Sequence, residues 1–233
     1  MIADARIGVL GGTFDPIHFG HLDAATAARD ALALERVLII PSHVPPHRPQ
    51  PIASAYHRFA MASLAVNGTT GLIVSDEELC SPGPSYTADT LGRLQARGFS
   101  ARQIFFIIGA DAFAEIETWS RYPAVLDLAS FVVISRRGVP ATSLRQRLPA
   151  LADRMGTPAE PHDGRAEPSI FLVDAQTRDI SATDVRHRLT CGQQISGLVP
   201  ASVEAHLLQH ALYAGAQHDR VSRRTADHLH GQN

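Results

Sequence analysis

Residues 11–21 read Gly-Gly-Thr-Phe-Asp-Pro-Ile-His-Phe-Gly-His, after the apolar run Ile7–Leu10 and before a segment rich in Ala and Leu. This order predicts a buried strand, a sharp turn at the glycines and a helix that begins near His21. A helix N-terminus offers free N–H groups and the positive end of the helix dipole. His18 and His21 are three residues apart, so they lie on one side of the helix start. The segment therefore predicts a site for an anionic group, above all a polyphosphate.

The same residues are compatible with a glycine-rich turn that carries two histidines without a role. Two known phosphate-binding signatures are absent from the segment. No Gly-Lys-Ser/Thr follows, so it is not a Walker loop, and the dinucleotide fingerprint Gly-x-Gly-x-x-Gly does not fit.

Composition favours one globular domain and small-molecule partners. The chain has 233 residues, of which 45% are hydrophobic and 19% charged, as in ordinary globular proteins. A net charge of −2 gives no general attraction to nucleic acid, so none is expected as a partner. All 21 basic residues counted as Lys or Arg are arginines, which excludes a lysine nucleophile. Assembly into a homo-oligomer is compatible with these data.

No apolar run is long enough to cross a bilayer and no leader precedes the first strand, so we expect a cytoplasmic protein without membrane attachment. Cys80 and Cys191 form no Cys-x-x-Cys pair, and we expect buried, inert thiols. Residues 215–233 are polar and aperiodic. They predict a flexible tail after a domain that spans residues 1–214.

Apolar runs alternate with helical patterns along the chain. The runs typical of strands are Ile7–Leu10, Val37–Ile40, Gly71–Val74, Ile104–Ile108, Phe131–Ile134 and Ile170–Val173. The helical patterns are Leu22–Leu34, Ser54–Val66, Thr87–Arg97, Ser143–Met155, Ala182–Leu189 and Ala201–Ala214. Continuous apolar strands separated by helices predict an α/β fold with a Rossmann-like, doubly wound, mostly parallel sheet. In such sheets ligands bind beyond the carboxyl ends of the strands.

Polar residues follow the second and third predicted strands. The loop Pro41–Arg48 carries His43, His47 and Arg48, which are donors for an anion or else solvated residues of a rigid surface loop. In the next segment, Ser85 or Thr87 is expected to cap the following helix. The free N–H groups of that helix are an alternative site for a substrate carboxylate.

Asp111 lies just after the fourth predicted strand, and Trp119 follows. A carboxylate at this place can accept hydrogen bonds from ribose hydroxyls. Alternatively, Asp111 caps a helix over Ala112–Ile116. Trp119 is the only Trp of the chain, and a packing role competes with a stacking role.

The segment Ile180–Arg186 follows the last predicted strand and begins a helix. Ser181 and Thr183 offer hydroxyls at the helix start, and Arg186 supplies a permanent positive charge. Alone, this segment predicts a helix N-cap. Together with residues 11–21 it predicts two helix N-termini that converge on one triphosphate.

In these motifs the chain resembles the bacterial nicotinate-nucleotide adenylyltransferase family of His-x-Gly-His nucleotidyltransferases. The resemblance extends from Arg6 to Tyr213 and is carried by residues 11–21, 44–48, 85–91, 108–111, 119 and 180–186. It implies transfer of the adenylyl group of ATP to nicotinate mononucleotide, giving nicotinate adenine dinucleotide and pyrophosphate in NAD biosynthesis. It also implies Mg²⁺ with ATP, and catalysis by alignment and by protonated or donor imidazoles.

The resemblance assigns residues to three roles. Catalysis falls to His18, His21 and Arg186. Binding of ATP falls to Gly11, Gly12, Thr13, Phe14, His18, His21, Gly109, Asp111, Ile180, Ser181, Thr183 and Arg186. Binding of the mononucleotide falls to Asp15, His47, Arg48, Ser85, Tyr86, Thr87 and Trp119. One departure is Ser42-His43, where many relatives place an amide or a lysine.

Three alternatives stay open. The enzyme could prefer nicotinamide mononucleotide, because backbone donors that would select a carboxylate are invisible in sequence. Pantetheine-phosphate adenylyltransferases share the first and last motifs, but they are shorter and lack the Ser-Tyr-Thr and Trp segments. A non-catalytic nucleotide-binding protein would be expected to have lost His18, His21 or Arg186, and all three are present.

Overall fold

The computed structural model describes residues 5–46, 50–81, 83–159 and 168–215. Its centre is a sheet of seven strands in the order β3-β2-β1-β4-β5-β7-β6, with every neighbouring pair parallel. The strands are β1 (Ile7–Gly12), β2 (Arg36–Pro41), β3 (Leu72–Val74), β4 (Ile104–Gly109), β5 (Ser130–Ile134), β6 (Met155–Gly156) and β7 (Ile170–Val173). The predicted Rossmann-like α/β class is confirmed.

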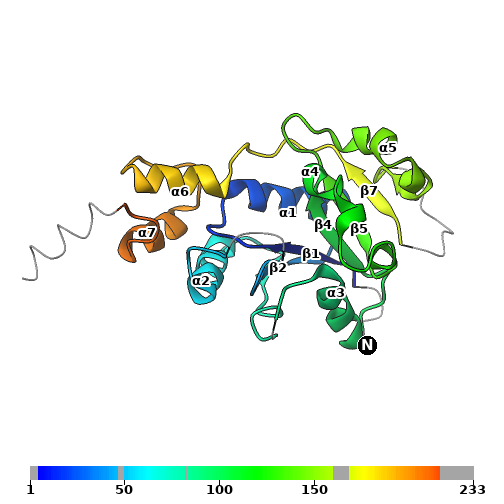
Figure 1. Ribbon diagram of the computed structural model, residues 1–233, viewed down its shortest axis with the longest axis horizontal. Helices are drawn as coiled ribbons and strands as arrows, with labels where there is room; N and C mark the ends of the chain where they lie inside the picture. The colour runs from blue at the N-terminus through cyan, green and yellow to red at the C-terminus, as the bar shows by residue number, and fades with distance from the viewer. Residues whose placement is uncertain (1–4, 47–49, 82, 160–167, 216–233) are drawn as a thin grey trace, which may run out of the picture.

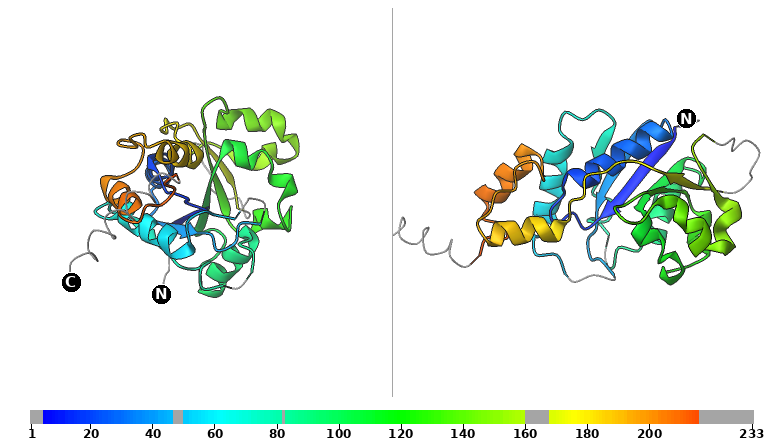
Figure 2. Two further views of the ribbon diagram at one scale, coloured as in Figure 1. Left: turned by 60° about the vertical axis from the view of Figure 1, so that its left-hand side comes forward. Right: turned by 90° about the horizontal axis from the view of Figure 1, so that it is seen from above.

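Helices cover both faces of the sheet (Figures 1 and 2). The α-helices are α1 (Phe19–Ala31), α2 (Ala55–Val66), α3 (Thr87–Ala96), α4 (Ala110–Phe113), α5 (Leu144–Arg147), α6 (Ala182–Thr190) and α7 (Ala201–Gln209). Short 3₁₀ helices are η1 (Ile116–Thr118), η2 (Ala124–Asp127), η3 (Ala141–Ser143) and η4 (Pro149–Arg154). One core cluster packs α1, α2, α6 and α7 against the sheet, and the other packs α3, α4 and α5. Strands buried on both faces are apolar throughout, which is why the apolar runs predict them.

The direction of chain winding reverses between β1 and β4. From β1 the chain proceeds to β2 and β3 on one side, whereas β4, β5 and β7 lie on the other. Loops after β1 and β4 therefore leave the sheet at a topological switch point, which is where open parallel sheets bind ligands.

The predicted helix Ser143–Met155 is wrong. Only Leu144–Arg147 is α-helical, and a 3₁₀ helix and the two-residue strand β6 follow. Pro149 lacks an N–H group and restricts the residue before it, so Leu148 leaves the helical region with φ −127° and ψ 65°. The predicted helix Ala201–Ala214 also ends early, at Gln209.

Both cysteines are exposed, which corrects the expectation of buried thiols. Cys191 caps the C-terminal end of α6, and Cys80 lies in a surface turn. The Cys80 thiol donates to an Asp76 carboxylate oxygen at 3.3 Å. This bond, with the negative charges of Asp76 and Glu77, raises the pKa of Cys80, which favours the protonated thiol over the thiolate.

Within the described ranges, no helix combines the length and the apolar character that a bilayer crossing requires. The domain limits of residues 1–214 stay a prediction. The predicted tail lies outside the described residues except for Gly215.

Candidate active site

The loop after β1 brings His18 and His21 together at the start of α1. His18 is the N-cap residue and is buried. Its backbone N–H donates to Nδ1 of His21 at 3.2 Å, and the two rings stack with centroids 3.7 Å apart. The Phe14 and His21 rings meet in a T-shaped arrangement, with their centroids 5.0 Å apart. Because Nδ1 of His21 accepts a bond, the neutral ring carries its proton on Nε2 and can donate from there.

The glycines of this loop do not make the sharp turn that the sequence predicts. Gly11 and Gly12 are the last residues of β1 and pair with β2. The left-handed backbone lies at Phe14 instead, with φ 50°. A Cβ on Gly12 would lie 2.9 Å from the Phe14 ring, so the missing side chain makes room for Phe14, which in turn supports His21.

Burial lowers the pKa of His18 from 6.5 to about 4, and the positive charge of Arg136 adds to this effect against an opposing contribution from Asp23. His18 is therefore neutral at pH 7. The sequence leaves open whether this imidazole acts as a protonated cation or as a neutral hydrogen-bond donor, and the structure favours the neutral donor.

The depressed pKa of His18 makes stability depend on pH. Below pH 6.5 the unfolded chain takes up a proton that the folded chain refuses until about pH 4, so stability falls as pH falls through this window. Between pH 7 and pH 5 we expect the wild type to lose about 2 kcal/mol more unfolding free energy than His18→Gln. Urea unfolding of both proteins at the two pH values measures this difference, and equal losses would contradict it.

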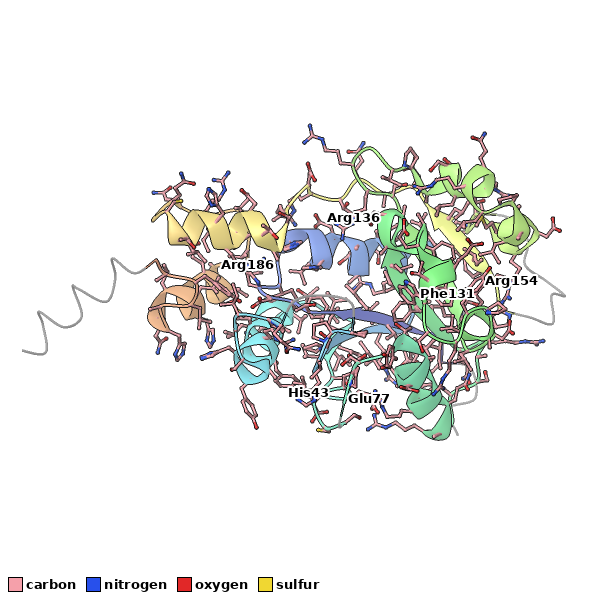
Figure 3. All side chains as sticks on the ribbon, viewed as in Figure 1. His43, Glu77, Phe131, Arg136, Arg154 and Arg186 are labelled. Carbon is pink, nitrogen blue, oxygen red and sulfur yellow. The ribbon has the colours of Figure 1, made fainter. Side chains whose placement is uncertain are left out.

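The segment that begins α6 lies against the loop after β1. Arg186 donates from Nη1 to the Asp15 carbonyl oxygen at 2.7 Å and from Nη2 to Thr183 Oγ1 at 3.1 Å. Figure 3 shows Arg186 where α6 approaches α1. Gly20 permits close contact, since a Cβ there would lie 2.9 Å from the Arg178 carbonyl oxygen. The N-termini of α1 and α6 are thus adjacent.

Ser181 is the N-cap residue of α6, as predicted, and its Oγ accepts from the Asp184 N–H at 3.0 Å. Arg178, on the approach to α6, holds the carboxylate of Asp23 in α1 with two donors at 2.9 and 2.7 Å. Ile180, which lies between Arg178 and Ser181 in the sequence, is half-buried. These bonds fix α6 relative to α1.

Asp15 has a buried carboxylate with three donors. Oδ2 accepts from the Ile52 N–H at 2.9 Å, and Oδ1 accepts from the Ala53 N–H at 3.0 Å and the Tyr213 hydroxyl at 2.5 Å. The side chain fastens the loop after β1 to the start of α2 and to the segment after α7. These bonds disfavour the expected contact of this carboxylate with the mononucleotide.

Removing the Tyr213 hydroxyl is expected to lower stability. Tyr213→Phe keeps the ring but leaves one oxygen of the buried Asp15 carboxylate with a donor fewer. We expect the unfolding free energy to fall by about 1–3 kcal/mol, as measured by urea denaturation. Tyr122→Phe is the control, and an equal loss in both variants would contradict this account.

Arg58 of α2 is buried and was not predicted as part of the site. Its guanidinium donates to the carbonyl oxygens of Thr13 at 2.7 Å, His43 at 3.3 Å and Ala53 at 3.3 Å. The side chain therefore joins the loops after β1 and β2 to α2. An arginine inside an amphipathic helix gives no sequence signal for these backbone partners.

The loop after β2 lies beside the segment that begins α3. The His43 N–H donates to Ser85 Oγ at 2.8 Å, and the Ser85 N–H donates to the Val44 carbonyl oxygen at 2.8 Å. The Ser85 hydroxyl thus accepts from the His43 N–H and does not cap α3. The N-cap residue is Tyr86, without a side-chain cap bond, and Thr87 is the first helical residue. The predicted caps are wrong, while His47 and Arg48 lie outside the described residues.

Asp111 is exposed in the first turn of α4, whose N-cap residue is Gly109. The helix begins two residues earlier than predicted, at Ala110 instead of Ala112, so Asp111 is not its cap. A Cβ on Gly109 would lie 2.5 Å from Asp111 Oδ1 and 3.0 Å from Arg136 Nε. Glycine therefore lets both side chains approach the end of β4.

Arg136 is a second residue that sequence reasoning missed. It is half-buried just after β5, beside Gly109, and its charge acts on His18. The loops after β1, β4 and β5 thus face one region. A basic residue two positions past a predicted strand was the available signal.

Trp119 is half-buried and meets the Phe106 ring edge-on, with centroids 6.1 Å apart. This contact belongs to the core cluster that holds α3 and α4. The indole thus has a packing role, and its stacking on a pyridine ring stays a prediction.

The site has the parts of a nucleotidyltransferase, with two helix N-termini, paired imidazoles and a guanidinium at a switch point. A model described as cytidylyltransferase-like matches residues 9–188, and the chain belongs to this family. Two curated relatives carry the name "Probable nicotinate-nucleotide adenylyltransferase". The protein of Desulfatibacillum aliphaticivorans is 39% identical and covers 89% of this chain and 99% of its own. That of Chromohalobacter salexigens is 40% identical and covers 90% and 96%. Within the family, the chain belongs with the nicotinate-nucleotide adenylyltransferases.

Solved structures agree on the fold. Plasmodium falciparum nicotinic acid mononucleotide adenylyltransferase complexed with APC has a TM-score of 0.68 at 16% identity, covering 90% of this chain and 97% of its own. The same protein complexed with NaAD has a TM-score of 0.67 at 16% identity and the same coverage.

Proposed function

We propose that this chain transfers the adenylyl group of ATP to nicotinate mononucleotide, giving nicotinate adenine dinucleotide and pyrophosphate in NAD biosynthesis. The observation that carries the proposal is the bond from Arg186 to the Asp15 carbonyl oxygen. It joins the start of α6 to the loop that carries the paired histidines at the start of α1. The N-termini of both helices can therefore bind one triphosphate.

The proposed reaction needs alignment and charge stabilisation more than proton transfer. The mononucleotide phosphate is already an anionic nucleophile, so it attacks the α-phosphorus of ATP in line and pyrophosphate leaves. His18 and His21 donate to the reacting phosphate, while Arg186, Ser181 and Thr183 bind the β- and γ-phosphates. No covalent adenylyl-enzyme forms.

The remaining roles follow the loops that surround this region. Gly109, Asp111 and Ile180 contact adenosine, with the Asp111 carboxylate accepting from ribose hydroxyls. The start of α3, with Ser85, Tyr86 and Thr87, and the residues near Trp119 bind the nicotinate side. His47 and Arg48 contact the mononucleotide phosphate.

Mg²⁺ enters the proposal as a companion of ATP. The groups that converge at the two helix N-termini are imidazoles, a guanidinium and N–H donors, and the Asp15 carboxylate is engaged by protein donors. This donor set fits a triphosphate whose own oxygens hold Mg²⁺. The ion neutralises phosphate charge when bound.

Pyrophosphate release tests the proposal. Purified protein with ATP and Mg²⁺ receives nicotinate mononucleotide, nicotinamide mononucleotide or phosphopantetheine in separate assays. We expect the highest kcat/KM with nicotinate mononucleotide, because helix N–H groups favour its carboxylate over an amide. A higher value with either other acceptor would reassign the substrate, and no release with any of them would favour a binding protein.

The proposal includes a cytoplasmic location and no nucleic-acid partner. A homo-oligomer stays an expectation from the sequence. Cell fractionation and size-exclusion chromatography test these points.

A further inference from the structure

Three histidines gather where α2 packs on α7, outside the residues proposed for adenylyl transfer. His57 lies in the first turn of α2, His206 in α7, and His210 caps the C-terminal end of α7. Nδ1 of His57 lies 3.0 Å from Nε2 of His206. Each ring offers one nitrogen, and these three nitrogens all lie within 4.8 Å of one another. We call these residues the histidine cluster.

The fold fixes the histidine cluster from both helices. His206 and His210 are four residues apart, so they lie on one face at the end of α7, and their ring centroids are 4.4 Å apart. Ser202 at the start of α7 donates to the Leu64 carbonyl oxygen in α2 at 3.0 Å. His57 and His206 are half-buried and His210 is exposed. The three rings therefore converge while one side stays open to solvent.

The chemistry of the histidine cluster matches a zinc ion. Zinc binds imidazole nitrogens at about 2.0–2.1 Å, so tetrahedral ligands lie about 3.4 Å from one another. The 3.0 Å approach of His57 and His206 is close to this spacing, and small ring rotations bring in the exposed His210. Mg²⁺ and Ca²⁺ prefer oxygen ligands, whereas imidazole suits Zn²⁺.

We propose that His57, His206 and His210 bind one Zn²⁺ ion, with water in the fourth position on the exposed side. The ion links α2 to α7.

A link between α2 and α7 bears on the candidate active site. Helix α2 carries Arg58, which holds the loops after β1 and β2. Tyr213 follows α7 and binds Asp15. Zinc therefore stabilises the two elements that support the loop after β1. The histidine cluster does not depend on the proposed reaction, so failure of one leaves the other intact.

Metal titration of the full chain tests the zinc site. After treatment with EDTA and its removal, the protein is titrated with ZnCl₂ against a chromophoric chelator, and separately with CoCl₂. We expect one tightly bound Zn²⁺ per chain, intense visible absorption of four-coordinate Co²⁺, and a higher Tm with zinc, since a ligand of the native state raises stability. Absence of binding at micromolar zinc would overturn the proposal.

Variants assign the binding to the cluster. His210→Ala removes an exposed side chain, so the fold is retained, and zinc affinity should fall by at least about a hundredfold. His57→Ala should have the same effect. The matched control is the double variant His228→Gln/His230→Gln, which removes two histidines elsewhere in the chain and should bind zinc as the wild type does. Unchanged affinity in His210→Ala, or loss of binding in the control, would overturn the assignment.

Discussion

Alanine in place of His18 or of His21 is expected to lower kcat for adenylyl transfer by at least about a hundredfold, because loss of one donor to transition-state charge costs about 2.7–4 kcal/mol. Both rings belong to one stacked pair, and His18 positions His21 through its backbone N–H. His18 is neutral at pH 7, so its contribution is a directed hydrogen bond rather than a full charge. Steady-state pyrophosphate release with saturating ATP and nicotinate mononucleotide measures the effect.

A control variant and two further measurements distinguish an effect on the chemical step from an effect on folding or on substrate binding. His187→Ala is the matched control, since His187 is an exposed histidine of α6 without an assigned role. Circular dichroism and urea unfolding show whether each variant is folded. A donor that acts mainly in the transition state should lower kcat more than it raises KM. Near-normal turnover in either folded variant would refute its catalytic role.

Local sequence patterns predicted the sheet and most helices because the residues that stabilise each of these elements lie within the element itself and are visible in its sequence. Strands such as β4 are buried on both faces and thus apolar along their whole length. Ser181 caps its own helix by accepting from the N–H of Asp184, which is only three residues further along the chain. The failures have equally physical causes. Pro149 interrupts a helical pattern, and the two residues of β6 are too few to show any periodicity.

The candidate site was less predictable because its supporting bonds are long-range. Asp15 has the residue type of a ligand contact, yet its carboxylate binds Tyr213, which lies 198 residues away along the chain. Arg58 binds backbone carbonyls, which have no residue-type signature. Ser85 was predicted to cap α3, but its hydroxyl accepts from the N–H of His43 in another loop. The sequence thus identifies the motifs that surround the proposed phosphate site, and folding decides which side chains remain available there.

Replacing Arg58 by methionine is expected to lower the unfolding free energy by about 3 kcal/mol or more. The guanidinium is buried and holds three carbonyl oxygens from two loops and the start of α2, and each buried acceptor left without a donor costs about 1–3 kcal/mol. Burial lowers the pKa of Arg58, and the charge of Asp15 is the largest opposing effect. The side chain stays charged, so its removal also takes away one of the positive charges near Asp15. Urea denaturation at pH 7 measures the loss.

Two further variants sharpen this prediction. Arg188→Met removes an arginine from a half-exposed pair with Asp184 in α6, where we expect about 0.5 kcal/mol or less. Arg58→Lys keeps the charge, but one ammonium on a flexible stem cannot reproduce the planar fork that reaches Thr13, His43 and Ala53. Lysine should therefore recover only part of the loss caused by methionine. If Arg58→Met were as stable as Arg188→Met, the three carbonyl bonds would not hold the loops after β1 and β2.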